Sequence, residues 1–137
     1  MNQIVQNDIV EIIPRFSFHE IDELNQKAWD IRRSDLRASW KLANDIERDS
    51  INNSYQKGIA ESSRTLGYCL WRFGDYPQSL EKSMLALEIF KSLGYKKGDL
   101  PVTEKVVNEI LSLPISPELK ASEQKLIIKT IKSFFKK

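Results

Sequence analysis

The sequence predicts an all-α fold of stacked antiparallel helical hairpins, and three observations carry this prediction. The chain repeats itself, because Tyr55-Gln56-Lys57-Gly58 returns as Tyr95-Lys96-Lys97-Gly98 at an offset of 40 residues. Its apolar residues recur at helical spacing, and no segment has the alternation of a β-strand. Glycine and proline residues mark the boundaries between the apolar segments. A period of about 40 residues is typical of helical hairpins that bury their apolar faces by stacking on one another.

The first hairpin is predicted from its start and stop signals. A short apolar helix is expected over 7–13, ending near Pro14. Ser17-Phe18-His19-Glu20 is a capping box, which predicts a helix over 18–33. Ser34-Asp35 then turns the chain into a helix over 36–51. On this second helix we expect three residues to face inward, namely Trp40, Ala43 and Ile46.

The second hairpin repeats this plan with stronger signals. Asn53-Ser54 is expected to start a long helix that continues to about Phe73. Gly74-Asp75-Tyr76-Pro77 supplies a left-handed helix end, an N-cap and a proline for the next first turn. The helix over 76–93 is apolar nearly all round, so we expect neighbours on two of its sides.

The repeat then stops, and the remaining chain predicts two further helices. Pro101 opens a helix to about Leu113, a link between Pro114 and Pro117 follows, and a last helix covers 120–135. Two repeats are fewer than the roughly three units that a stable stack needs. We therefore predict that 101–137 docks as a substitute third hairpin. It would use Val106, Ile110, Leu113, Ile127, Ile131 and Phe134 to cover Leu85, Ile89 and Leu93.

Composition limits the domain organisation and the class of partner. With 137 residues, 41% hydrophobic and 29% charged, the chain predicts one soluble domain over 1–137. We divide this domain into an N-terminal helix (1–16), two hairpins (17–98) and a tail (99–137). The net charge of +2 divides into about −1 over 1–100 and +3 over 101–137. Without a dense basic stripe this excess is a solvated helix face, and no nucleic-acid partner is expected.

Location and redox chemistry are limited in the same way. Cys69 is the single cysteine, so neither an internal disulfide nor a thiolate metal site is expected. No apolar run approaches the roughly 18 residues of a membrane span. The N-terminus lacks the basic segment and the apolar stretch of a signal peptide. The sequence therefore predicts a cytoplasmic protein that has no membrane partner.

The second copy of the repeat resembles a known family. The run Leu66-Gly67-Tyr68-Cys69-Leu70-Trp71-Arg72-Phe73-Gly74-Asp75-Tyr76 is similar to the first helix and turn of a tetratricopeptide repeat. Small residues follow at Ser79, Ser83 and Ala86, which lets the two helices approach closely. The resemblance covers about 20–98, with a period longer than the usual 34 residues. Long-period repeats of this kind resemble those of bacterial signalling proteins.

The tail resembles a different family. Gly98-Asp99-Leu100-Pro101-Val102-Thr103-Glu104-Lys105, followed by Leu113-Pro114-Ile115 and Pro117-Glu118-Leu119, is similar to the C-terminal end of DegT/StrS-type sugar aminotransferases that use pyridoxal phosphate. This resemblance covers 98–137. Together the two resemblances imply a chimaera joined near Leu93–Asp99.

No enzymatic activity is expected. The Schiff-base lysine and the phosphate-binding groups of such aminotransferases lie upstream of the part that the tail resembles. The chain also lacks a Gly-rich phosphate loop, a GxSxG motif and a cluster with metal-ligand spacing. His19 lies inside the capping box, where a solvated residue is a simpler interpretation than a general base. We therefore expect neither a cofactor nor a metal.

The tetratricopeptide resemblance implies a binding surface on the concave side of the repeats. Carried over residue by residue, it implies twelve positions that line this side: Asp22, Asn25, Gln26, Trp29, Arg32, Arg33, Glu61, Arg64, Thr65, Tyr68, Trp71 and Arg72. We predict nine of them to bind the partner, namely Asn25, Gln26, Trp29, Arg32, Arg33, Arg64, Tyr68, Trp71 and Arg72. Aromatic rings beside arginines suit an extended peptide with acidic groups or a free C-terminal carboxylate. The alternative for Trp29, Tyr68 and Trp71 is that they are core residues packed against the flanking helices.

These expectations lead to one main function and one alternative. The main hypothesis is a non-catalytic module that binds a protein or peptide on the concave face. The alternative is a structural or chimaeric fusion, whose aminotransferase-like tail only caps the repeats or mediates self-association. A homodimer is compatible with both.

Overall fold

The computed structural model describes residues 15–112 and 120–135. The described residues form six α-helices and no strand, which confirms the all-α fold class: α1 (Phe18–Ile31), α2 (Leu36–Asn52), α3 (Gln56–Phe73), α4 (Tyr76–Ser92), α5 (Pro101–Ser112) and α6 (Ala121–Phe135). Several expectations lie outside what the structure describes, namely the helix at 7–13, the link between Pro114 and Pro117, and the side chains of Leu113, Ile131 and Phe134.

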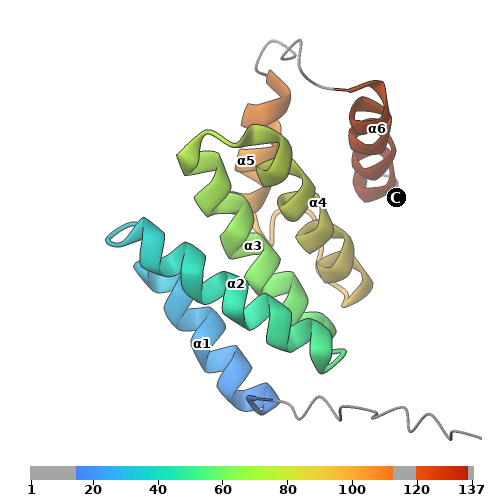
Figure 1. Cartoon of the computed structure of the whole chain (residues 1–137). Coiled ribbons are helices and arrows are strands. Elements are labelled where there is room, and N and C mark those ends of the chain that lie inside the picture. The colour runs from blue at the N-terminus through green and yellow to red at the C-terminus, as the bar shows by residue number, and fades with distance from the viewer. Residues whose placement is uncertain (1–14, 113–119, 136–137) are drawn as a thin grey trace, which may run out of the picture.

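The helices pack in chain order as neighbouring hairpins (Figure 1). α1 packs on α2 and α3 packs on α4, while α2 and α1 both contact α3. α5 lies across α3 and α4, and α6 lies beside α4 on the side away from α1 and α2 (Figure 1). α4 therefore has neighbours on more than one side, as its apolar pattern predicts.

The helix ends follow the predicted caps, with one difference. Ser17 and Glu20 form the capping box, and the side chains of Asp35 and Asp75 accept hydrogen bonds at the starts of α2 and α4. The difference is at α3, which begins at Gln56 instead of near Asn53. Ser54 adopts a positive φ of 52°, so the chain turns there before the helix can begin.

The 40-residue period is repeated in the hydrogen bonds. Ser39 Oγ donates to the Ala28 carbonyl at 2.7 Å, and Ser79 Oγ donates to the Gly67 carbonyl at 2.7 Å. In the first hairpin the Tyr55 amide donates to the Ser50 carbonyl at 2.9 Å. In the second hairpin the Tyr95 amide donates to the Phe90 carbonyl at 3.0 Å. One helical hairpin with the same internal contacts is thus used twice.

Small residues bring α3 and α4 together as the sequence predicts. A Cβ atom on Gly67 would lie 2.2 Å from Ser83 Oγ and 3.1 Å from the Ser83 backbone nitrogen. Because contacts below 3.0 Å cannot be accommodated without movement, only glycine allows this approach of the two helices. Ser79, Ser83 and Ala86 are all buried on the facing side of α4.

The expected inward position of Trp40 is wrong. Its side chain is 40% exposed and packs edge-on against Phe73, which is itself largely exposed. The inner position belongs to the preceding residue, Ser39, because its hydroxyl binds the Ala28 carbonyl. One residue further along a helix turns the side chain by about 100°, which carries Trp40 to the outer face.

The tail docks on the second hairpin, but α5 and α6 do so separately, each through its own contacts. From α5 and the turn before it, Leu100 and Val107 join the core around α4, and Val106 packs with Tyr68 and Cys69 of α3. From α6, Ile127 packs against the core around α4. Among the described residues α6 contacts α4 alone, so α5 and α6 do not form a hairpin with each other.

The predicted cover over α4 is incomplete. Ile89 is partly buried in the core, but Leu85 remains 37% exposed and Leu93 remains 46% exposed. The side of α4 that carries Leu85 therefore keeps an apolar surface between α4 and α6.

Candidate functional site

The predicted binding residues of α1 and α3 form a cluster of arginines and aromatic rings. The Trp29 and Tyr68 rings meet edge-on with centroids 6.1 Å apart, and Tyr68 packs on Trp71 at 5.8 Å. Two guanidinium groups lie over the Trp29 ring, with Arg32 at 3.7 Å and Arg64 at 4.1 Å. We call Trp29, Arg32, Arg64, Tyr68, Trp71 and Arg72 the arginine–aromatic cluster.

Helix periodicity brings this cluster together. On α1, Trp29 and Arg32 are three residues apart and therefore share a face. On α3, the positions of Arg64, Tyr68, Trp71 and Arg72 follow the same spacing. Because α1 packs alongside α3, the two faces join into one surface.

Arg64 is the least compensated member of the cluster. Burial lowers the pKa of its guanidinium group, Glu61 opposes this shift, and the positive charge of Arg32 adds to it. Arg64 Nε is buried without a hydrogen-bond partner. Within the described part of the chain, the cation is stabilised by the carboxylate of Glu61, by the Trp29 ring and by the Phe90 ring at 6.0 Å. A charge placed in this way favours a nearby anion.

Arg32 makes a hydrogen bond within the chain, but like Arg64 it is a partly buried cation whose Nε has no partner. One of its terminal nitrogens donates to the Trp29 carbonyl at 2.7 Å, while its Nε is buried without a partner. Burial lowers the pKa of Arg32, and the neighbouring Arg33 lowers it further. Two guanidinium groups beside one ring therefore concentrate positive charge where it is partly shielded from water.

The aromatic members contribute to the core as well as to the surface. Tyr68 is 7% exposed and packs with Cys69 and Val106, while Trp29 and Trp71 are half-buried around them. Arg72 is exposed and donates to the Tyr68 hydroxyl at 3.3 Å. The core interpretation of the aromatic residues thus holds for Tyr68 and in part for Trp29 and Trp71.

The other predicted residues lie elsewhere. Asn25 is 1% exposed, and its amide donates to the Gly58 carbonyl of α3 at 3.2 Å. Asn25 therefore belongs to the α1–α3 contact and not to the surface. Gln26 is exposed and donates to Asp30 at 2.8 Å. Arg33 is exposed next to the cluster.

A second polar group is centred on Asp22, one of the concave-side positions that the resemblance implies, and its contacts were not predicted from the sequence. Asp22 accepts a hydrogen bond from the Tyr55 hydroxyl at 2.8 Å and from Lys57 Nζ at 2.9 Å. Tyr55 also stacks on Phe18 with centroids 4.1 Å apart. The hydrogen bond to Asp22 raises the pKa of Lys57, which favours the charged ammonium group. The repeated Tyr55–Gly58 motif marks this turn, but its partner Asp22 is 33 residues away from Tyr55.

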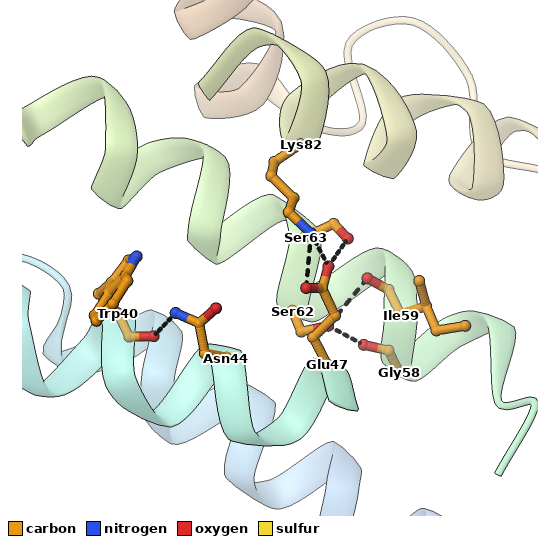
Figure 2. A network of polar contacts seen from close by, with 8 residues as sticks. All are labelled: Trp40, Asn44, Glu47, Gly58, Ile59, Ser62, Ser63 and Lys82. Carbon is orange, nitrogen blue, oxygen red and sulfur yellow. Dashed lines mark hydrogen bonds and ion pairs between the residues drawn. The ribbon is translucent and has the colours of Figure 1, made fainter. Parts of the chain in front are cut away.

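A further network of polar contacts joins α2, α3 and α4. Figure 2 shows Glu47 of α2 between Lys82 of α4 and Ser63 of α3. Lys82 Nζ lies 2.7 Å from both carboxylate oxygens, and Ser63 Oγ donates to one of them at 2.9 Å. Glu47 is 8% exposed, so the network is a structural ion pair whose groups are all used internally.

The described residues contain no group of three or more histidine, cysteine or acidic side chains able to hold a metal ion. Burial raises the pKa of the Cys69 thiol, which makes it a poor nucleophile. His19 is exposed in the capping box beside Glu23, at 3.5 Å. No helix of the described residues is both long and apolar enough to cross a membrane.

Two comparisons with known proteins found a match, and the family match lies in the C-terminal half of the chain. The model of the DegT/DnrJ/EryC1/StrS aminotransferase family matches residues 79–132. A pleiotropic regulatory protein of Geobacillus stearothermophilus is 48% identical over 48 residues, which are 35% of this chain and 13% of that protein. The chain thus spans about an eighth of the length of this relative. No solved structure matches.

The family match supports the resemblance of the tail and moves its boundary. The expected start was Gly98, whereas the match begins at Ser79 and so includes most of α4. The join expected near Leu93–Asp99 therefore lies inside the matched segment. α4 belongs both to the second hairpin and to the part that is similar to an aminotransferase family.

Proposed function

We propose that this chain is a cytoplasmic, non-catalytic interaction module of the tetratricopeptide type. It would bind a protein or peptide through the arginine–aromatic cluster on α1 and α3. The repeated hairpin contacts and the Gly67 packing are what such a repeat requires. The partner would carry acidic side chains or a free carboxylate.

The state of Arg64 carries this proposal. Its guanidinium group is partly buried over Trp29, lies near a second guanidinium group, and has no acceptor within the described residues for its Nε. An isolated charge that is partly removed from water is unfavourable unless an opposite charge pairs with it. A carboxylate of the partner would accept two parallel hydrogen bonds from such a guanidinium group.

The test is direct binding of acidic peptides. We would titrate the chain with fluorescent peptides rich in Asp and Glu, and with matched peptides that carry Asn and Gln instead. We expect binding of the acidic peptides alone, weakened by salt because the contact is ionic. Arg64→Gln should reduce affinity at least about tenfold, which corresponds to about 1.4 kcal/mol.

Two measurements separate binding from folding. Arg48→Gln is the matched control, since this arginine of α2 is 68% exposed, lies outside the predicted binding residues and should change affinity by less than about threefold. The melting temperature of Arg64→Gln should stay close to that of the parent chain, because glutamine keeps two of the three methylene groups of the arginine side chain. If Arg64→Gln unfolds the chain, or if acidic and neutral peptides bind alike, the proposal is wrong.

The alternative function draws on the C-terminal half. The match over 79–132 and the separate docking of α5 and α6 favour a fusion in which the tail caps the repeats. In that case the arginine–aromatic cluster would serve packing alone. Absence of peptide binding together with loss of stability in Arg64→Gln would support this alternative.

A further inference from the structure

A groove between α4 and α6 forms a second surface, separate from the arginine–aromatic cluster. Its volume is about 290 Å³. Apolar side chains form its floor and one edge, namely Met84 and Leu85 of α4 and Leu126 and Ile127 of α6. Leu126 is 56% exposed and Leu85 is 37% exposed, although a protein interior would normally cover both.

Acidic residues line this groove on both helices, with Glu81 and Glu88 on α4 and Glu123 on α6. Glu81, Leu85 and Glu88 follow one another at helical spacing, so they form one stripe along the exposed face of α4. Neither carboxylate makes an ion pair or a hydrogen bond with another described residue. We call Glu81, Leu85 and Glu88 the acidic stripe.

Basic residues lie beside the exposed apolar residue of α6. Leu126 is flanked by Lys125 and Lys129, and all three are exposed. Lys129 is three residues after Leu126 and shares its side of the helix. Neither lysine has an ion-pair partner among the described residues. We call Lys125, Leu126 and Lys129 the basic stripe.

The geometry points to self-association of this chain through the α4–α6 groove, with a second copy as the occupant. One molecule presents an acidic stripe that lines the groove and, on the outer part of α6 next to the groove, a basic stripe, each with an exposed leucine. In a twofold dimer, Leu126 of each copy would enter the groove of the other. Its flanking lysines would then meet Glu81 and Glu88 of the other copy. A twofold contact requires such self-complementary patches, because each surface must serve as both partners.

This inference does not depend on the proposed peptide binding. The groove lies on α4 and α6, whereas the arginine–aromatic cluster lies on α1 and α3. A dimer of this kind would leave the cluster free and present two copies of it. Failure of one proposal therefore leaves the other standing.

The experiment measures molecular mass by sedimentation over about a hundred-fold range of protein concentration. The parent chain should change from a monomer of 15.9 kDa to a dimer as concentration rises. Leu126→Glu should weaken the dimer at least about tenfold, since it places a charge in the apolar groove. Lys41→Glu is the control, because this exposed lysine lies on α2, which does not contact α6.

Charge reversal gives the sharpest form of the test. The double variants Glu81→Lys/Glu88→Lys and Lys125→Glu/Lys129→Glu should each be monomeric, because like charges would face each other across the twofold axis. An equimolar mixture of the two should form a dimer again, since each acidic stripe then meets a basic one. Misfolding cannot produce this recovery.

The outcomes that overturn the inference are equally defined. A parent chain that stays monomeric at every concentration excludes the second copy as occupant. A dimer that persists in Leu126→Glu and in both double variants uses another surface. Two double variants that fail to associate when mixed show that the stripes do not face each other.

Discussion

In the hairpins α1–α4, neighbouring helices are joined by hydrogen bonds between side chains and backbone, whereas α5 and α6 are held mainly by apolar side chains. Ser39 and Ser79 join the helices within each hairpin, and Asn25 joins α1 to α3. Glu47 then connects α2 to α3 and α4. On the tail, Leu100, Val106, Val107 and Ile127 make the contacts with the core.

This difference concerns how each region specifies its position. A hydrogen bond requires a particular donor opposite a particular acceptor, so it fixes the register of two helices. Apolar packing requires only that a surface of suitable shape and volume is covered. Individual hydrogen bonds therefore specify the register of the hairpin helices. The position of the tail depends instead on the apolar surface of α3 and α4 that it covers.

Shortening the tail in two steps should give the largest effect and separate α5 from α6. A chain that ends at Gly98 loses Leu100, Val106 and Val107, which are at most 7% exposed. Burial of each such side chain contributes about 1.5–3 kcal/mol. Their sum is comparable with the whole net stability of a small domain, about 5–15 kcal/mol. We expect this chain to aggregate or to melt far below the parent.

A chain that ends at Ser112 keeps α5 and is the matched comparison. It loses the contact of Ile127 and the hydrogen bond that Lys91 donates to the Ser133 carbonyl. We expect it to stay folded, with a loss of about 1–3 kcal/mol. Thermal unfolding followed by circular dichroism, together with light scattering, measures both. Equal melting of the two shortened chains would contradict the separate docking of α5 and α6.

Removing the cation of the network in Figure 2 should lower the free energy of unfolding by less than shortening the tail does. This loss concerns contacts among the helices of the two hairpins. Lys82→Met leaves the Glu47 carboxylate buried with Ser63 as its remaining partner. Because Lys82 keeps 29% of its side chain exposed, the loss should be below that of a fully buried pair, at about 2 kcal/mol. Urea unfolding gives the free energy.

The double variant Lys82→Met/Glu47→Gln is the control for this network. It removes both charges, so it should recover at least half of the loss seen with Lys82→Met. If the double variant is less stable than Lys82→Met, the pair contributes through packing and not through charge.

Much of the fold could be predicted from the sequence, because the signals were local. The capping box at Ser17, the caps at Asp35 and Asp75, and the close packing of Gly67 all depend on residues within one helical hairpin. The orientation of Trp40 could not be predicted in this way. Its apolar side chain indicates burial, but the hydrogen bond of Ser39 to Ala28 decides which face of α2 points inward.

The candidate site shows the same limit. The tetratricopeptide resemblance implied that Trp29, Arg32, Arg64 and Tyr68 share one surface, and the structure brings their rings and guanidinium groups together. It could not show that the Asn25 amide, on the same face, donates a hydrogen bond to the Gly58 carbonyl of another helix. Nor could it place Lys82 beside Glu47, since 35 residues separate them in the chain. Contacts between helices depend on their packing, which no single helix encodes.

The smallest expected effect concerns the charge of Glu61, which lies on α3 beside the arginine–aromatic cluster. Burial raises the pKa of its carboxyl group above the ordinary value of 4.5, although Lys57 and Arg64 oppose the shift. The folded chain therefore binds this proton more tightly than the unfolded chain does. The free energy of unfolding must then fall as pH rises from about 4.5 through the raised pKa.

Glu61→Gln should remove this part of the pH dependence and raise stability at pH 7 by up to about 1 kcal/mol. Glu20→Gln is the comparison with the opposite sign. Hydrogen bonds from the Ser17 backbone and side chain lower the pKa of Glu20, so its contribution is present above pH 4.5 and is lost on acidification. Urea unfolding between about pH 2 and pH 7 measures both variants. If Glu61→Gln leaves the pH profile unchanged, or destabilises the chain at pH 7, then Glu61 is stabilised in its charged form. In that case Arg64 already has a working counter-ion within the chain, and the argument that it needs a carboxylate from a partner fails.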